Sequence, residues 1–201
     1  MLKTQYETYK QIAGCDEAGR GCLAGPVYAA AVILHPDKPI EGLDDSKKLS
    51  KKKRDELRQK IEQNTQAWAV ARVSNTVIDK INILNASILA MQKAVKLLNA
   101  KPDFILVDGN RFKPMDGYKH ACIIKGDSKY AAIAAASILA KTHRDEFMEK
   151  IHAEYSDYFW NKNKGYPTKQ HRKAITENGI TKHHRKSFRL VDKQTKLKFK
   201  K

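Results

Sequence analysis

Apolar positions along the chain fall into two patterns: short continuous runs, and longer stretches in which they recur every three or four residues. The periodic stretches predict amphipathic helices over 50–63 and 77–98. The short runs are rich in small and β-branched residues, and they predict strands over 11–15, 27–34, 67–73, 104–107 and 120–124. Strands that alternate with helices are typical of an α/β domain, in which helices pack on a sheet.

The composition and the hydrophobic pattern of the chain change after residue 157. Residues 128–151 contain no Gly or Pro and many Ala, which predicts a buried helix with Ser128 as its cap. Short polar pieces follow, with a helix near 168–177 and then a run of lysines. We therefore expect a single domain, with a core over about 1–157, a basic helical extension over about 158–190 and a basic tail over 191–201.

The net charge of +17 sets this chain apart from an ordinary globular domain. Residues 161–201 carry 14 Lys or Arg against two acids, so the last fifth of the chain holds most of the excess. A basic flank beside a nearly balanced body attracts a polyanion, which predicts a nucleic acid as the partner. A basic surface that only keeps the protein in solution is the alternative.

The sequence predicts neither export nor membrane insertion. No run approaches the roughly 18 apolar residues of a membrane helix, and the first residues lack the apolar core of a secretory signal, so a cytoplasmic location is expected. Cys15, Cys22 and Cys122 form no C-x-x-C pair, which argues against a disulfide framework and against a zinc site. We expect the thiols to be reduced and the protein to be a monomer.

Three carboxylates stand where predicted strands end. Asp16 and Glu17 follow the apolar run that ends at Cys15, and Asp108 follows the run that ends at Val107. If these strands are neighbours, the acids lie together at one edge of the sheet, where like charges need a cation among them. Oxygen ligands favour Mg²⁺ or Mn²⁺ over zinc, and a pair of such ions serves phosphoryl displacement. Helix caps and surface charge are the alternative interpretation.

A fourth acid is needed to fill the ligand shells of two ions, and Asp127 and Asp145 are the candidates. If both lie on one unbroken helix, 18 positions at about 1.5 Å per residue separate them by roughly 27 Å, so both cannot reach the same ions. Asp127 follows a glycine at the helix entrance, whereas Asp145 stands beside Arg144 and can pair with it. We therefore assign Asp127 to the metal site.

Ten segments between Ile12 and Phe188 occur in the order found in one known family. On these segments the chain resembles ribonuclease HII, the type 2 ribonuclease H of bacteria. The segments that carry most of the chemistry are Asp16-Glu17-Ala18-Gly19-Arg20-Gly21, Asp45-Ser46-Lys47-Lys48-Leu49, Val107-Asp108-Gly109-Asn110, Lys125-Gly126-Asp127-Ser128, Lys164-Gly165-Tyr166 and His184-Arg185-Lys186-Ser187-Phe188.

The resemblance implies an RNase H-like fold, with a mixed sheet flanked by helices. It also implies cleavage of RNA in RNA–DNA hybrids and cleavage 5′ of a single ribonucleotide embedded in duplex DNA, leaving 5′-phosphate and 3′-hydroxyl ends. The four metal-binding acids of the family correspond to Asp16, Glu17, Asp108 and Asp127, which would hold two Mg²⁺ or Mn²⁺ ions.

Substrate contacts are implied as well. Gly19, Arg20 and Gly21 would sense the 2′-hydroxyl through their backbone, and Tyr166 would pack against the deoxyribose at the RNA-to-DNA junction. Seven residues in matching segments are expected to contact phosphates: Ser46, Lys47, Lys48, Lys141, His184, Arg185 and Ser187. The mechanism needs no histidine as a general base, so five histidines are expected at the surface or in packing: His35, His120, His143, His152 and His171.

The tail suggests one further partner. Gln194, Leu197 and Phe199 are similar to the short Gln-x-x-Leu-x-Phe pattern with which bacterial proteins dock into the sliding clamp. A disordered lysine tail that screens the DNA backbone is the alternative.

Two other functions stay open at this stage. A DNA junction resolvase of the same fold shares acids at strand ends but has no use for the Gly-Arg-Gly segment. A non-catalytic RNA-binding protein explains the charge but has no use for those acids.

Overall fold

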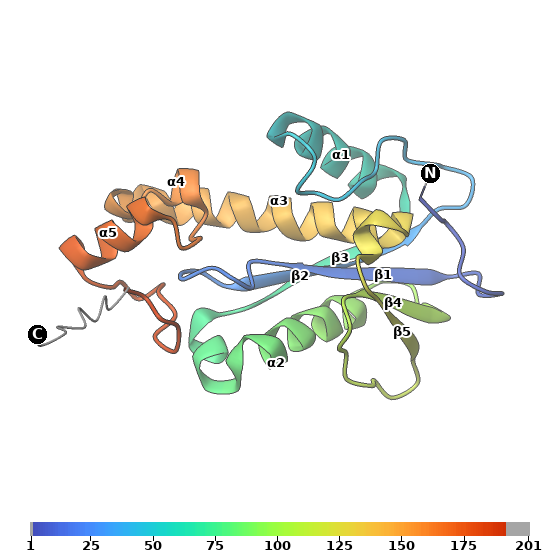
Figure 1. Ribbon diagram of the computed structural model, residues 1–201. Coiled ribbons are helices and arrows are strands. Elements are labelled where there is room, and N and C mark those ends of the chain that lie inside the picture. Colours follow the sequence, from blue (N-terminus) through green and yellow to red (C-terminus); the bar gives the residue numbers. More distant parts are fainter. Residues whose placement is uncertain (1, 192–201) are drawn as a thin grey trace, which may run out of the picture.

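The computed structural model of the protein describes residues 2–191, which form a five-stranded sheet with helices on both faces (Figure 1). The strands are β1 (Ile12–Ala18), β2 (Val27–Leu34), β3 (Thr65–Val73), β4 (Phe104–Asp108) and β5 (Lys119–Ile123), in the order β3-β2-β1-β4-β5. β2 pairs antiparallel with both β1 and β3, whereas β4 pairs parallel with both β1 and β5. The sheet is therefore mixed, which confirms the predicted fold class.

Helices cover the two faces of the sheet unequally. Two of them, α1 and α3, lie on one face, α2 lies on the other, and α4 and α5 gather at the far end of α3 (Figure 1). Their bounds are α1 (Lys51–Asn64), α2 (Asn75–Lys96), α3 (Ala131–Glu154), α4 (Trp160–Asn163) and α5 (Lys169–Asn178), with single turns η1 (Gly126–Ser128) and η2 (Ser156–Tyr158).

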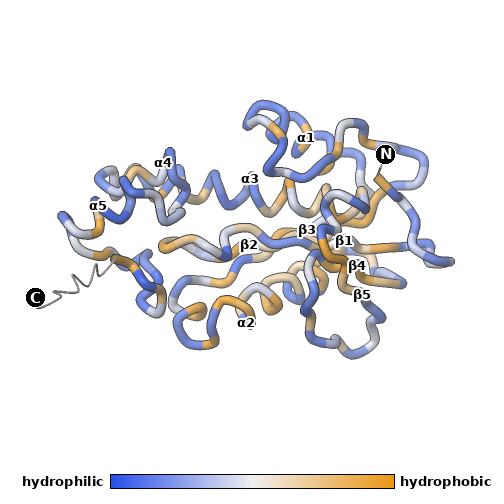
Figure 2. Tube along the Cα trace, viewed as in Figure 1, coloured by the Kyte–Doolittle hydropathy of each residue, from blue (hydrophilic) through white to orange (hydrophobic). Residues whose placement is uncertain are grey.

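The core follows the two-residue alternation of a strand. On β2, Ala30 and Val32 pack with α1 and α3, whereas Ala29 and Ala31 pack with α2. Hydrophobic residues concentrate along the sheet and along α2, while α1 is mostly hydrophilic (Figure 2). Both faces of the central strands are therefore covered, which is why their sequences read as nearly continuous apolar runs.

Small residues let α3 lie unusually close to β1. A Cβ added to Gly14 would stand 2.1 Å from the carbonyl carbon of Ala132, and residues 131–136 of α3 are five alanines and one isoleucine, all buried. No side chain larger than hydrogen fits at Gly14 without moving the helix. This close contact fixes the start of α3 over the end of the sheet that carries the predicted acids.

Two predicted boundaries are wrong, and both matter for the site. β1 continues to Ala18 because Asp16 and Glu17 still pair with Ala30 and Ala29 of β2, so these acids lie within the strand and not after it. The helix predicted from Ser128 begins at Ala131. Ser128 does not cap it, because its hydroxyl donates to the Lys125 carbonyl within the η1 turn.

The C-terminal part of the described chain packs on the end of α3. Trp160 is fully buried among Met148 and Ile151 of α3 and Ala174 and Ile175 of α5. The predicted extension therefore shares its own small hydrophobic cluster with α3.

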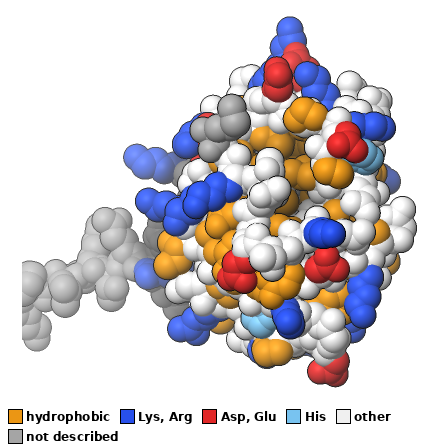
Figure 3. Space-filling view, turned by 90° about the vertical axis from the view of Figure 1, so that its right-hand side faces the viewer, with side chains coloured by type: hydrophobic (Ala, Val, Ile, Leu, Met, Phe, Trp, Pro, Cys, Tyr) orange, Lys and Arg blue, Asp and Glu red, His pale blue; other side chains and the backbone are white. Residues whose placement is uncertain are grey.

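None of the helices within residues 2–191 is long and apolar enough to cross a membrane. Figure 3 views the end of the molecule opposite the C-terminal segment, where hydrophobic side chains gather in the middle of the face and charged side chains lie mainly around them.

Candidate active site

Asp16 and Asp108 lie side by side at the end of two parallel strands. Cys15 pairs with Val107, so the next residue on each strand falls at the same level and on the same face of the sheet. Asp16 is 5% exposed, and it accepts hydrogen bonds from the Glu17 backbone N–H at 2.6 Å and from the Ser137 hydroxyl of α3. Burial raises the pKa of Asp16 well above its usual value, and the charges of Glu17 and Asp108 raise it further.

Glu17 points to the opposite face of the sheet from Asp16, because successive residues of a strand alternate. Burial raises the pKa of Glu17, and Asp108 adds to the effect, while the guanidinium of Arg20 acts against it. Arg20 pairs with Glu17 at 3.3 Å between Nη1 and Oε1. The half of Arg20 that remains exposed faces solvent beside the site.

Asp127 reaches the same region through the η1 turn. The Gly126 N–H donates to Oδ1 of Asp108 at 2.7 Å, which ties the turn to the end of β4. Lys125 adopts a left-handed conformation with φ of 55°, and this reverses the chain so that Asp127 is only 5% exposed. Burial raises the pKa of Asp127, and the charges of Asp108 and Asp45 raise it further.

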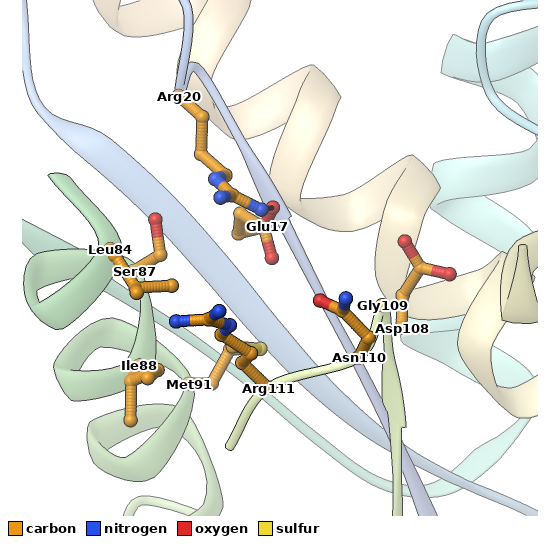
Figure 4. Close-up of a pocket in the computed structure, with 10 residues that line it drawn as sticks. All are labelled: Glu17, Arg20, Leu84, Ser87, Ile88, Met91, Asp108, Gly109, Asn110 and Arg111. Carbon is orange, nitrogen blue, oxygen red and sulfur yellow. Dashed lines mark hydrogen bonds and ion pairs between the residues drawn. The ribbon is translucent and has the colours of Figure 1, made fainter. Parts of the chain in front are cut away.

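A cavity of about 240 Å³ opens beside these acids, between β1, α2 and the loop after β4 (Figure 4). The Glu17 carboxylate points into it, whereas Asp108 stands at its edge with its carboxylate turned away (Figure 4). Three of its lining residues, Ser87, Met91 and Arg111, were not predicted as site residues. Ser87 is a polar residue within the apolar stripe of α2, and that signal was available in the sequence.

The four acids fit a divalent cation by their chemistry. They are anionic oxygen donors, and Asp108 raises the pKa of the other three, so a cation among them would lower the electrostatic cost of keeping them ionised. Within residues 2–191, no set of three or more His, Cys, Asp or Glu side chains is already spaced to enclose one ion. The carboxylates therefore interact electrostatically, but within the described residues they do not converge on a single point.

The Gly19-Arg20-Gly21 segment leaves β1 directly after the acids. Gly19 has φ of +96°, and an added Cβ would stand 2.0 Å from Nε of Arg144, so glycine is required there by the fold. Gly21 is different, because it is exposed and an added Cβ would meet no atom within 4 Å. Packing within the protein therefore does not explain why residue 21 is a glycine.

Arg185 does not serve as the predicted phosphate contact, because its side chain is fully buried. Its three nitrogens donate to backbone carbonyls of the loop after β1: Nε to Gly25 at 3.0 Å, Nη1 to Arg20 at 2.8 Å and Nη2 to Gly19 at 2.7 Å. Burial lowers the pKa of Arg185 to about 10. The guanidinium therefore supports the Gly-Arg-Gly segment from the interior.

Arg144 supports the same loop from α3. It donates to the carbonyls of Pro26, Ala24 and Lys164 at 3.1, 3.1 and 2.8 Å. The expectation that Arg144 pairs with Asp145 is wrong. Asp145 instead accepts from Nζ of Lys141 at 2.6 Å.

Two more of the residues that were predicted to contact phosphates, His184 and Ser46, are buried, and this burial argues against the predicted contact. His184 is 1% exposed and lies in the C-terminal cluster. Ser46 is 3% exposed, and its hydroxyl lies 2.9 Å from that of Ser137. Since Ser137 donates to Asp16, the Ser46 hydroxyl donates to Ser137, and Ser46 supports Asp16 indirectly.

The other four predicted phosphate contacts differ in their surroundings. Lys47 and Lys48 are exposed, and Nζ of Lys47 lies 3.9 Å from Oδ2 of Asp127. Ser187 is exposed and donates its hydroxyl to Asp79 at 2.6 Å. Lys141 is mostly buried, and its ammonium group is already paired with Asp145.

Tyr166 lies beside the Gly-Arg-Gly loop although 145 residues separate it from Gly21. The Leu23 N–H donates to the Gly165 carbonyl at 2.8 Å, which joins the two segments. The Tyr166 ring lies 6.0 Å from the Arg144 guanidinium and contacts the Cys22 thiol, and it remains 40% exposed. The partly exposed Tyr166 ring therefore lies next to Cys22, in the loop that follows Asp16 and Glu17.

Residues 13–191 match the family model described as Ribonuclease HII. The ribonuclease HII of Christiangramia forsetii is 60% identical over 96% of this chain and 98% of its own, and that of Bacteroides thetaiotaomicron is 58% identical over 93% and 94%.

Solved structures give the same result. The PCNA:RNase HII complex of Archaeoglobus fulgidus matches with a TM-score of 0.78 and 28% identity, covering 92% of this chain and 98% of that one. The ribonuclease H2 of Pyrococcus horikoshii matches with a TM-score of 0.75 and 26% identity, covering 90% and 95%. The fold is therefore the RNase H-like fold predicted from the resemblance. With its acids at the ends of β1 and β4 and its near-complete match to these relatives, the chain belongs to the ribonuclease HII family and is an endoribonuclease of the ribonuclease H type.

Proposed function

We propose that this enzyme hydrolyses the RNA strand of RNA–DNA hybrids and also cuts 5′ of a single ribonucleotide embedded in duplex DNA, leaving 5′-phosphate and 3′-hydroxyl ends. The observation that carries the proposal is that the Gly19-Arg20-Gly21 segment leaves β1 directly after Asp16 and Glu17, and that Leu23 joins the same loop to Gly165, the neighbour of Tyr166. A surface that can recognise a sugar thus adjoins a site that can hold the ions for phosphodiester hydrolysis.

Asp16, Glu17, Asp108 and Asp127 would hold two divalent ions, Mn²⁺ or Mg²⁺. When bound, such ions lower the pKa of a water molecule and stabilise the departing 3′-oxygen. The chain itself orients the ligands. The Ser137 hydroxyl and the Glu17 N–H hold Asp16, and the Gly126 N–H holds Asp108.

Recognition of the ribonucleotide rests on backbone geometry. Gly21 is exposed with free space where a side chain would stand, so a sugar can approach its backbone closely. Arg185 holds the carbonyls of Gly19 and Arg20 in place and leaves the outer side of the segment accessible. We assign Tyr166 to the deoxyribose that follows the ribonucleotide, where a 2′-hydroxyl would collide with the ring.

The phosphate contacts that remain in the proposal are Lys47, Lys48, Lys141 and Ser187. The two exposed lysines lie in the loop before α1, and Lys47 lies near Asp127, so a bound strand could contact these lysines and the metal site together. Lys141 would have to exchange part of its pairing with Asp145 for a phosphate. The basic extension over about 158–190 is assigned to gripping the duplex beyond the cut.

The sliding clamp is proposed as a protein partner. The pattern formed by Gln194, Leu197 and Phe199 lies outside the described residues. Support comes from the solved relative from Archaeoglobus fulgidus, which is a complex of RNase HII with PCNA. Equal binding of wild type and Phe199→Ala to purified clamp, or no binding by either, would remove this partner.

The central experiment compares three duplexes: one with a single embedded ribonucleotide, one with a continuous RNA strand, and one of DNA alone, each with Mn²⁺ and with Mg²⁺. We expect cleavage of the first two and none of the third. Cleavage of the DNA duplex would favour a resolvase-like activity. Mapping of the product ends tests the predicted cut position.

Asp108→Asn is the matched catalytic control. The amide oxygen of Asn can still accept from the Gly126 N–H, so the fold and the η1 turn are kept while one anionic ligand is lost. We expect cleavage to fall by at least about 1,000-fold with hybrid binding largely retained. Substantial metal-dependent cleavage by folded Asp108→Asn would exclude Asp108 from the metal site.

A further inference from the structure

Two buried histidines, His171 and His184, are not used by the chemistry proposed above. His171 lies on α5 and is 0% exposed, and His184 is 1% exposed. Their rings lie 5.4 Å apart among the side chains of Tyr158 and Trp160. Two buried basic groups of this kind are costly unless their polar atoms have hydrogen-bond partners.

The hydrogen-bond partners allow only one arrangement of protons on the two rings. The indole N–H of Trp160 can only donate, and it points at Nε2 of His171 at 3.0 Å, so this nitrogen accepts. The backbone N–H of Thr181 can only donate, and it points at Nδ1 of His184 at 2.9 Å, so His184 carries its proton on Nε2. That Nε2–H faces Nε2 of His171 at 3.3 Å, where it shares the single lone pair of this nitrogen with the closer Trp160 N–H and forms the weaker of the two hydrogen bonds.

The arrangement directs the remaining proton of His171 at Tyr166. With Nε2 accepting, His171 carries its proton on Nδ1, which lies 2.9 Å from the Tyr166 carbonyl oxygen. The Tyr166 N–H in turn donates to the Asn163 carbonyl at 2.8 Å. The backbone of Tyr166 is thus held on both sides, while its ring remains 40% exposed beside the Gly-Arg-Gly loop.

We propose that His171 is a positioning residue for Tyr166, and that His184 orients His171 through the chain of hydrogen bonds from Thr181 to the Tyr166 carbonyl. This inference rests on the proposed role of Tyr166 at the RNA-to-DNA junction. An apolar ring of similar size would fill the same space, but it would leave the Trp160 N–H and one acceptor of the Tyr166 carbonyl without partners. His171 combines an acceptor and a donor on opposite sides of one rigid ring.

The asparagine and glutamine variants of His171 separate the two halves of this role. The side-chain NH₂ of asparagine falls near the place of Nδ1, so His171→Asn can still donate to the Tyr166 carbonyl. Glutamine carries its amide near the place of Nε2, so His171→Gln can still accept from Trp160 but loses the link to Tyr166. Both variants remove the imidazole and differ only in which bond survives.

The measured quantity is a ratio: kcat/KM on the embedded-ribonucleotide duplex divided by kcat/KM on the hybrid with a continuous RNA strand. We expect His171→Gln to lower this ratio about tenfold, mainly through kcat, because a displaced ring no longer selects the junction. His171→Asn should stay within about threefold of wild type. In a Tyr166→Ala background, His171→Gln should cause no further change in the ratio.

Two further variants guard against an unfolded His171→Gln. His184→Asn keeps an acceptor for the Thr181 N–H but loses the donor to His171, and it should lower the ratio by about threefold. His183→Gln is the control in the same cluster. Among the described residues 2–191 its Nε2 has no hydrogen-bond partner, so this variant should leave the ratio unchanged.

If His171→Gln and His171→Asn each lowered kcat/KM equally on both substrates, the inference would be overturned. His171 would then act only in packing. A wild-type enzyme that does not distinguish the two substrates would instead refute the proposed function of Tyr166. Imidazole ¹⁵N NMR separates these failures, because it reports the protonated nitrogen without any substrate. A proton on Nε2 of His171 in the wild type would contradict the hydrogen-bond chain itself.

Discussion

Nη2 of Arg185 donates to the carbonyl of Gly19 at 2.7 Å, although 166 positions separate the two residues. The same guanidinium also holds the carbonyls of Arg20 and Gly25. Through this one side chain the C-terminal end of the described chain holds the loop that follows β1. We therefore expect the C-terminal segment to support the geometry of the candidate active site as well as to supply charge.

Arg185→Lys keeps the positive charge and removes the fork that binds three carbonyls. We expect the free energy of unfolding to fall by about 2–4 kcal/mol, because buried carbonyls lose their donors. Chemical denaturation measures this loss. The salt dependence of duplex binding should stay unchanged, because the side chain touches no phosphate. Lys48→Ala is the contrasting variant, with wild-type stability and a salt slope lower by about one. If Arg185→Lys also lowered the salt slope of duplex binding, Arg185 would contact a phosphate after all.

Gly19→Ala and Gly21→Ala should have opposite effects. At Gly19 a methyl group collides with Arg144 and the φ of +96° is strained, so we expect a loss of stability of about 2 kcal/mol or more. At Gly21 the space is open, so stability should change by less than about 0.5 kcal/mol. Cleavage at an embedded ribonucleotide should nevertheless fall at least tenfold in Gly21→Ala. Wild-type cleavage by Gly21→Ala would mean that no sugar approaches this backbone.

Ser137→Ala removes the hydroxyl that holds Asp16 and also isolates Ser46. Residues that orient a metal ligand commonly change metal affinity by about 10- to 100-fold, so we expect the Mn²⁺ concentration for half-maximal activity to rise by at least tenfold. Ser128→Ala is the control, because the hydroxyl of this exposed serine donates to the Lys125 carbonyl, whereas its hydrogen bond to Asp127 comes from the backbone, which alanine keeps. Equal metal titrations for Ser137→Ala and wild type would show that Asp16 needs no such support.

The buried His184 should make the fold less stable in acid. Burial lowers its pKa from 6.5 to about 4, so between these values the unfolded chain binds a proton that the folded chain does not. The contribution of neutral His184 to the free energy of unfolding is fully present above about pH 6.5 and decreases as the pH falls. Near pH 4 the whole contribution, on the order of 3 kcal/mol, has been lost. His184→Asn cannot titrate there. The difference in unfolding free energy between wild type and His184→Asn should therefore rise with pH across this window, and a constant difference would contradict a neutral buried His184.

The sequence determined the order of strands and helices and the α/β class, and it predicted the four acids as a metal site. These follow from local patterns: apolar runs predict buried strands, and Asp108 marks the end of one because an acid cannot continue into the core. The motifs around Asp16 and Asp127 also pointed to the ribonuclease HII family, whose model residues 13–191 match.

Only the tertiary structure decided which polar residues of those motifs are exposed and which are buried. Arg185, His184 and Ser46 are buried, whereas Lys47 and Lys48 are exposed, and nothing in their immediate sequence distinguishes the two groups. The physical reason is that a guanidinium, an imidazole or a hydroxyl binds a backbone carbonyl or a neighbouring side chain as readily as a phosphate. For Arg185 and Ser46 the partners lie more than 90 positions away and come close only when the sheet, α3 and the C-terminal segment pack together, whereas His184 meets Thr181 and His171 of its own segment.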